Sequence, residues 1–118
     1  MTINEKCRKL PVLKTRTVEW GGGKKQPDGS ITWPFPIYGP EVDEWIRLMY
    51  ELELTDHDYM EHFEAIKAKS VEKMTRDEVL SYMTYLIRGE RFCDGLIAGA
   101  LRDGTLEALS VRLRQLTV

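Results

Sequence analysis

The chain has 118 residues, of which 42% are hydrophobic and 31% are charged. These values are typical of one folded domain, and they exclude a disordered or collagen-like chain. The formal net charge of −2 argues against direct nucleic-acid binding, because a domain that binds nucleic acid is normally basic.

The first predicted element is a basic, β-like arm over residues 1–39. Two runs rich in β-branched and aromatic residues, 12–20 and 31–38, are separated by a stretch rich in glycine and other turn formers. This pattern predicts an antiparallel hairpin or a pair of extended arms. Pro34 and Pro36 lack a backbone N–H group, so we expect the second run to be an edge strand or polyproline-like.

From residue 40 to residue 118 the pattern changes to that of helices. Apolar residues recur at helical spacing in four stretches: Val42, Trp45, Ile46, Met49 and Leu52; Tyr59, Phe63 and Ile66; Val79, Met83, Leu86 and Ile87; Leu106, Leu109, Leu113 and Leu116. Thr55-x-x-Asp58 resembles a capping signal for the second stretch, and Thr75-x-x-Glu78 is a capping box for the third. Gly104 is typical of a helix end. We therefore predict an α+β fold, with an N-terminal hairpin on a body of four or five helices.

Charge is segregated along the chain. Residues 1–25 carry a net charge of +5, whereas residues 41–64 carry nine acids and one base. The acids are Glu41, Asp43, Glu44, Glu51, Glu53, Asp56, Asp58, Glu61 and Glu64. Such a run could imitate a nucleic-acid backbone and inhibit a basic protein partner. The simpler interpretation is a solvated face, partly neutralised by the protein's own basic arm.

Residues 88–95 read Arg-Gly-Glu-Arg-Phe-Cys-Asp-Gly and contain the main candidate site. If the third helix continues through Gly89, its buried stripe includes Glu90 and Asp94. Carboxylates on such a stripe lose hydration and repel each other, so they need cations, donors, a metal or a proton. The two arginines of the stretch could supply the cations and hold an anionic ligand. The candidate residues of this polar pocket are Arg88, Glu90, Arg91, Cys93 and Asp94.

Other interpretations of the same stretch stay open. The charges could form a salt-bridge network that fixes helix packing. Alternatively, the helix could break at Gly89, so that both carboxylates reach water; a glycine inside a helix costs only about 1 kcal/mol. A small enzyme could use Glu90 or Asp94 as an acid or base, or Cys93 as a nucleophile. A cysteine in a helix is more often a small buried hydrophobic residue.

Other motifs give weaker signals. His57 and His62 are five residues apart, which does not place two ligands on one helical face, so we predict neither a metal nor a cofactor. The glycine- and lysine-rich residues 21–25 fail the phosphate-loop pattern and are better explained as a flexible hairpin tip. Trp33, Phe35 and Tyr38 could form a recognition surface, although aromatic residues next to prolines usually pack on helices.

A resemblance supports the choice of residues 88–95. That stretch, the Glu-Trp-Gly-Gly-Gly run at 19–23, the aromatic and proline-rich run at 33–38, and the downstream residues up to Gly104 resemble an uncharacterised bacterial family, domain of unknown function 6508. The similarity covers about residues 17–116. It implies a small domain of bacteria and their mobile elements, and it brings no established activity.

The sequence also suggests a location and a class of function. Residues 1–9 lack the apolar core of a signal peptide, and no stretch approaches the roughly 20 apolar residues of a membrane helix. Cys7 and Cys93 are too few for a disulfide framework, so we expect free thiols in the cytoplasm. We expect a small binding or regulatory module, with a protein or a small anionic ligand as its partner. A protein-binding inhibitor that uses the acidic run and a small enzyme are the alternatives.

Overall fold

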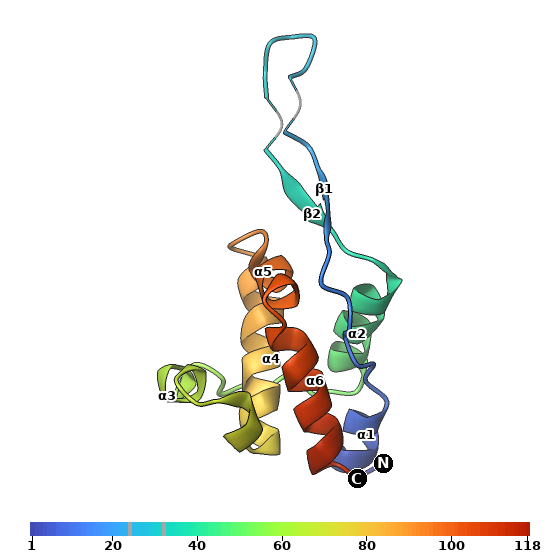
Figure 1. The fold of residues 1–118 in the computed structure, drawn as a ribbon, viewed down its shortest axis with the longest axis vertical. Coiled ribbons are helices and arrows are strands. Elements are labelled where there is room, and N and C mark those ends of the chain that lie inside the picture. Colours follow the sequence, from blue (N-terminus) through green and yellow to red (C-terminus); the bar gives the residue numbers. More distant parts are fainter. Residues whose placement is uncertain (24, 32) are drawn as a thin grey trace.

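The structure, a computed structural model, describes residues 1–23, 25–31 and 33–118. The α+β prediction is confirmed: a helical body carries a two-stranded antiparallel hairpin (Figure 1). The elements are α1 (Ile3–Arg8), β1 (Glu19–Gly21), β2 (Phe35–Ile37), α2 (Pro40–Glu51), α3 (Phe63–Lys67), the 3-10 helix η1 (Val71–Lys73), α4 (Arg76–Glu90), α5 (Leu96–Arg102) and α6 (Thr105–Leu116). Among the described residues, no helix has the length and apolar character to cross a membrane.

The hairpin extends away from the helices and makes the molecule long, with principal extents of 54 × 28 × 23 Å (Figure 1). In β1 and β2, Trp20 is paired with Pro36, and a single bridge between Lys25 and Ile31 continues the pairing outward. The strands are shorter than the β-like runs. In the first run, residues 13–16 make hydrogen bonds and a salt bridge to α2 and α6 instead of pairing with a strand.

Several contacts attach this incoming segment to α6 and α2. The backbone N–H of Leu13 donates to Ser110 Oγ over 3.3 Å, and the Arg16 guanidinium forms a 2.8 Å salt bridge with Glu107. On the other side, Glu41 of α2 accepts hydrogen bonds from the Lys14 backbone and the Thr15 hydroxyl group. The base of the hairpin is therefore held between two helices.

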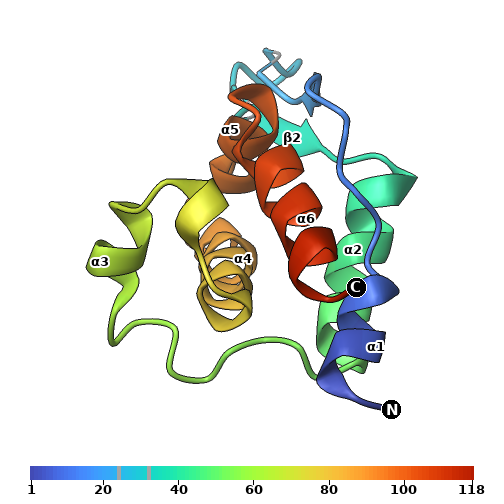
Figure 2. The same cartoon turned by 60° about the horizontal axis from the view of Figure 1, so that its bottom comes forward.

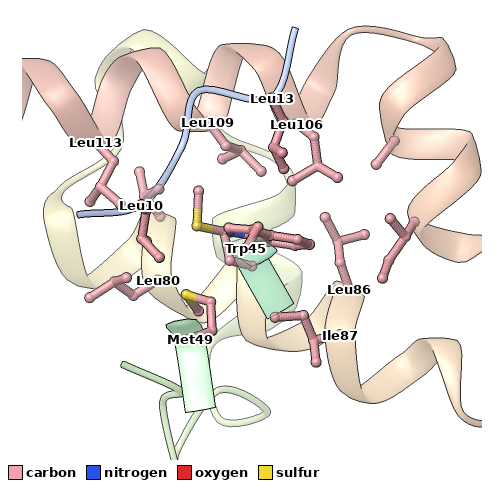
Figure 3. Packing of buried hydrophobic residues seen from close by; sticks show 14 of the residues in the cluster. Leu10, Leu13, Trp45, Met49, Leu80, Leu86, Ile87, Leu106, Leu109 and Leu113 are labelled. Atoms are coloured by element: carbon pink, nitrogen blue, oxygen red, sulfur yellow. The ribbon is translucent and has the colours of Figure 1, made fainter. Parts of the chain in front are cut away.

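The core lies where α2, α4 and α6 meet. Figure 2 shows α6 between α4 and α2, and Figure 3 shows Trp45 of α2 surrounded by leucines of α6 and α4 and by residues of the N-terminal segment. The Trp45 side chain is fully buried, and its indole N–H has no hydrogen-bond partner among the described residues. Apolar packing, not a polar contact, therefore holds this ring in the core.

The predicted helix boundaries are right for α4 and wrong for the preceding helix. Thr75 and Glu78 form the predicted capping box. In contrast, Thr55 and Asp58 do not begin a helix, because α3 starts only at Phe63. The Asp56 carboxylate accepts the backbone N–H of Asp58 over 2.9 Å and a hydrogen bond from the Ser81 hydroxyl group, and these bonds favour a turn over a helix.

The core packing predicts the effect of shortening one leucine. Leu109 of α6 is fully buried, so Leu109→Ala should lower the free energy of unfolding by about 2–5 kcal/mol. Val111 lies on the same helix but is exposed, and Val111→Ala should change stability by less than about 0.5 kcal/mol. Urea unfolding followed by circular dichroism measures both values. Similar losses for the two variants would contradict the described packing.

Candidate functional site

Residues 88–95 form the end of α4 and the turn that leads into α5. The helix continues through Gly89 and ends at Glu90. Residues 91–95 then change the direction of the chain before α5 begins at Leu96. The periodicity of α4 therefore does not extend to Asp94, whose side chain is exposed, while Glu90 is half-buried. The two carboxylates lie in different surroundings.

The Glu90 carboxylate binds the N-terminus of α5. Its Oε2 accepts the backbone N–H of Gly95 over 2.9 Å, and its Oε1 accepts that of Ile97 over 2.8 Å. The first N–H groups of a helix have no partner within the helix, and its N-terminus carries partial positive charge. A carboxylate at this position satisfies two donors and is stabilised by the dipole. Glu90 thus joins the end of α4 to the start of α5.

Tyr38 attaches the hairpin to the same point. Its hydroxyl oxygen accepts the backbone N–H of Ala98 over 3.0 Å, so a third donor at the N-terminus of α5 is satisfied from outside the helix. Burial, together with the charge of Glu90 and a hydrogen bond to it, raises the pKa of Tyr38 above its usual range. A neutral tyrosine can donate a hydrogen bond from its hydroxyl group to the carboxylate, while its oxygen accepts the hydrogen bond from the Ala98 amide. The base of the hairpin, α4 and α5 therefore meet at one hydrogen-bonded junction.

The two arginines point toward aromatic rings. Arg88 lies over the ring of Tyr59, 5.3 Å from the ring centroid. Arg91 lies 6.0 Å from the ring centroid of Tyr50 and donates a 3.4 Å hydrogen bond to its hydroxyl group. In the described part of the chain, no salt bridge joins either arginine to Glu90 or Asp94. Two backbone amides and the Tyr38 hydroxyl group, rather than guanidinium groups, donate hydrogen bonds to Glu90.

The remaining residues of the turn are on the surface. Phe92 is 92% exposed, and Cys93 and Asp94 are also exposed. Cys93 is a free cysteine, as is the buried Cys7. The histidines lie elsewhere: His57 is in the loop after α2, and His62 precedes α3. Among the residues that the structure describes, no group of three or more His, Cys, Asp and Glu side chains is placed to hold a metal ion.

Large apolar side chains are exposed along the hairpin. They are Trp20, Ile31, Trp33, Phe35 and Ile37, with Trp33 86% exposed. Of the aromatic residues considered in the sequence, Tyr38 packs against the core, whereas Trp33 and Phe35 do not. The alternation of the strands could have indicated which side chains face outward. It could not show that the hairpin extends beyond the body, where no helix covers it.

The hairpin and the turn touch each other at Trp20. Gly95 has a φ of +97°, which favours glycine, and a Cβ at this position would lie 3.2 Å from Cη2 of Trp20. The indole ring therefore lies against the turn that also presents Phe92. At the other end of the hairpin, Lys24 lies outside the described residues, and Gly22 has a φ of +74° and passes close to the Trp33 carbonyl group. Gly22 and Gly23 both have positive φ angles, so the backbone conformation at these two positions favours glycine.

The acidic run serves several different local structures. Glu41 binds the incoming segment, and Glu44 and Glu51 both pair with Arg47. Asp43 and Glu64 are exposed on α2 and α3. The other members, Glu53, Asp56, Asp58 and Glu61, line a cavity beside α3. The run is therefore not one uniform surface, although part of it is concentrated at this cavity.

The junction predicts unequal roles for the two carboxylates of the turn. Glu90→Ala leaves the Gly95 and Ile97 amides without their acceptor, so it should lower the free energy of unfolding by about 1–3 kcal/mol. Asp94→Ala removes an exposed carboxylate and should change stability by less than about 0.5 kcal/mol. Chemical denaturation at neutral pH measures the difference. Equal effects of the two substitutions would show that Glu90 has no special structural role.

Comparison with known proteins identifies a family. No curated protein and no solved structure matches the chain. A family model described as a family of unknown function matches residues 9–117, which include the hairpin, the junction and every helix except α1. The chain therefore belongs to this family, domain of unknown function 6508.

Proposed function

We propose that the protein is a binding module that contacts a protein partner through its hairpin. The contact surface consists of the exposed side chains of Trp20, Ile31, Trp33, Phe35 and Ile37, together with Phe92 of the adjacent turn. Because Trp20 is paired with Pro36, it lies on the face of the two strands opposite to Phe35 and Ile37, next to the turn, so the surface wraps around the hairpin. We call this surface the aromatic arm. The observation that carries the proposal is that several large apolar side chains are exposed on one element that extends from the body.

The exposure of these side chains is unusual for a small domain. Scattered apolar residues are common on protein surfaces, but contiguous apolar patches often mark sites of interaction. Tryptophan and arginine are enriched among the residues that contribute most to the binding energy of protein interfaces. The aromatic arm contains two tryptophans, and Arg91 directly precedes Phe92 in the sequence. Burial of one large apolar side chain contributes about 1.5–3 kcal/mol. A partner with an apolar surface would gain this contribution at several positions.

The hairpin is attached firmly enough at its base to present this surface in a defined orientation. Tyr38 fixes the outgoing end to α5, and Leu13 and Arg16 fix the incoming segment to α6. Preorganisation of this kind reduces the entropy lost on binding. The exposed polar groups of Arg91 and Asp94 supply a polar rim beside Phe92. In this proposal, residues 91–95 contribute to recognition as a surface.

The setting we propose is regulatory and cytoplasmic. The free thiols of Cys7 and Cys93 support a reducing compartment. The resemblance noted above adds bacteria and their mobile elements as the place where such a module acts. A binding module can regulate a partner by occupying a surface that the partner needs for another interaction.

Site-specific photo-crosslinking tests the aromatic arm in the cell. Trp33 or Phe92 is replaced by p-benzoylphenylalanine, and the exposed Val111 of α6 is replaced in the same way as the control. We expect the same discrete adduct from positions 33 and 92 and none from position 111. A second substitution, Ile31→Ser, should reduce the adduct roughly tenfold, because it removes a large apolar contact. Equal labelling from all three positions would contradict the proposal.

A further inference from the structure

A second surface lies beside α3, away from the aromatic arm (Figure 1). It is a cavity of about 650 Å³ between α1, the loop after α2, α3 and the first turn of α4. Its apolar lining comes from Ile3, Leu54, Ile66 and Leu80, and six carboxylates also line it: Glu53, Asp56, Asp58, Glu61, Asp77 and Glu78. We call this cavity the acidic groove. It combines an apolar lining with a strong negative charge.

Only part of this charge is neutralised within the protein. Glu78 pairs with Lys69, and Asp77 pairs with Arg76. Among the described residues, no lysine or arginine forms a salt bridge with Glu53, Asp58 or Glu61. His62 also lines the groove, and its imidazole lies 4.0 Å from the Glu61 carboxylate. The groove therefore has carboxylates available for cations from another molecule.

We propose that the acidic groove docks a basic, amphipathic segment of a protein partner. An apolar side chain of the segment would lie against Ile3, which is 40% exposed, above the buried side chains of Leu54, Ile66 and Leu80. Flanking lysines or arginines would pair with the carboxylates. Such a segment complements the groove in two ways. The carboxylates attract cationic side chains, and the apolar lining favours a segment that also carries an apolar side chain. The volume of the groove, about 650 Å³, is within the range of protein pockets that bind small ligands, so it can hold a few side chains of a peptide.

The same features disfavour other occupants. The carboxylates would repel a nucleic-acid phosphate. A simple polyamine could pair with the carboxylates, but it lacks an apolar side chain for the lining. A peptide segment that carries both kinds of group matches the whole surface. This inference is independent of the aromatic arm, because the two surfaces share no residue.

Fluorescence anisotropy with synthetic probes tests the proposal on the full chain. The probe is a fluorescein-labelled hexapeptide of alternating lysine and leucine. The comparison peptides replace leucine by serine or lysine by glutamate, and spermine serves as an unlabelled competitor. We expect the lysine–leucine peptide to bind most tightly, the lysine–serine peptide roughly tenfold more weakly, and the glutamate–leucine peptide not at all. Binding should weaken as salt increases, because exposed charges are screened.

Matched variants locate the binding. Asp58→Asn with Glu61→Gln removes two exposed carboxylates of the groove, and it should weaken binding of the lysine–leucine peptide roughly tenfold. Asp43→Asn with Glu64→Gln removes two exposed carboxylates that do not line it, and it should leave binding within about twofold. Ile3→Ser, at a partly exposed position of the lining, should reduce the preference for leucine over serine.

Several results would overturn the proposal. Equal weakening by the two double variants would show a general charge effect, and equal binding of the lysine–leucine and lysine–serine peptides would show that the apolar lining is not used. Displacement of the peptide by an equal concentration of spermine would identify a small polyamine, and not a protein segment, as the preferred occupant. Trp33→Ser should leave peptide binding unchanged, because Trp33 does not line the groove. If the proposal for the acidic groove is wrong, the proposal for the aromatic arm is therefore unaffected.

Discussion

The arrangement of this protein depends on one carboxylate, that of Glu90, at the N-terminus of a short helix. The helix α5 has seven residues and no side-chain cap from its own N-cap residue, Gly95. A helix this short is marginal by itself, so its start needs partners from elsewhere. Glu90 at the end of α4 and Tyr38 at the base of the hairpin provide them. Three parts of the chain are thereby fixed relative to one another, and the orientation of the aromatic arm follows from this junction.

The sequence predicted the parts of the fold that depend on local pattern. The apolar spacing around Trp45, Met83 and Leu109 predicted three helices that each bury one face, and the capping box of Thr75 predicted the start of α4. The prediction of a helix start at Thr55 was wrong, because hydrogen bonds that favour a turn compete with the helix there. Thr55-x-x-Asp58 has the form of a cap, but the bonds of Asp56 to Ser81 and to a nearby amide form a turn. Such a bond, between residues 25 positions apart, has no local signal in the sequence.

For residues 88–95, the sequence indicated that one carboxylate needs partners, but it did not indicate which partners the structure provides. The periodicity of α4 identified Glu90 as a carboxylate in need of partners, because a half-buried charge must be compensated. It could not identify the partners, since they are backbone amides of a helix whose start depends on the turn at residues 91–95. The exposure of Phe92 and Trp33 depends on how far the hairpin extends beyond the body. That distance is a tertiary property, and aromatic residues of the same composition could equally have packed on a helix.

Native-state amide hydrogen exchange, measured by NMR, tests the central role of Glu90 most directly. The Gly95 and Ile97 amides donate to its carboxylate, whereas the neighbouring Asp94 amide has no hydrogen-bond acceptor among residues 1–23, 25–31 and 33–118. The account predicts that the Gly95 and Ile97 amides exchange at least about tenfold more slowly than the Asp94 amide, after correction for intrinsic rates. If all three amides exchange at the same unprotected rate, the carboxylate does not bind the start of α5, and Glu90 is instead free to bind a ligand.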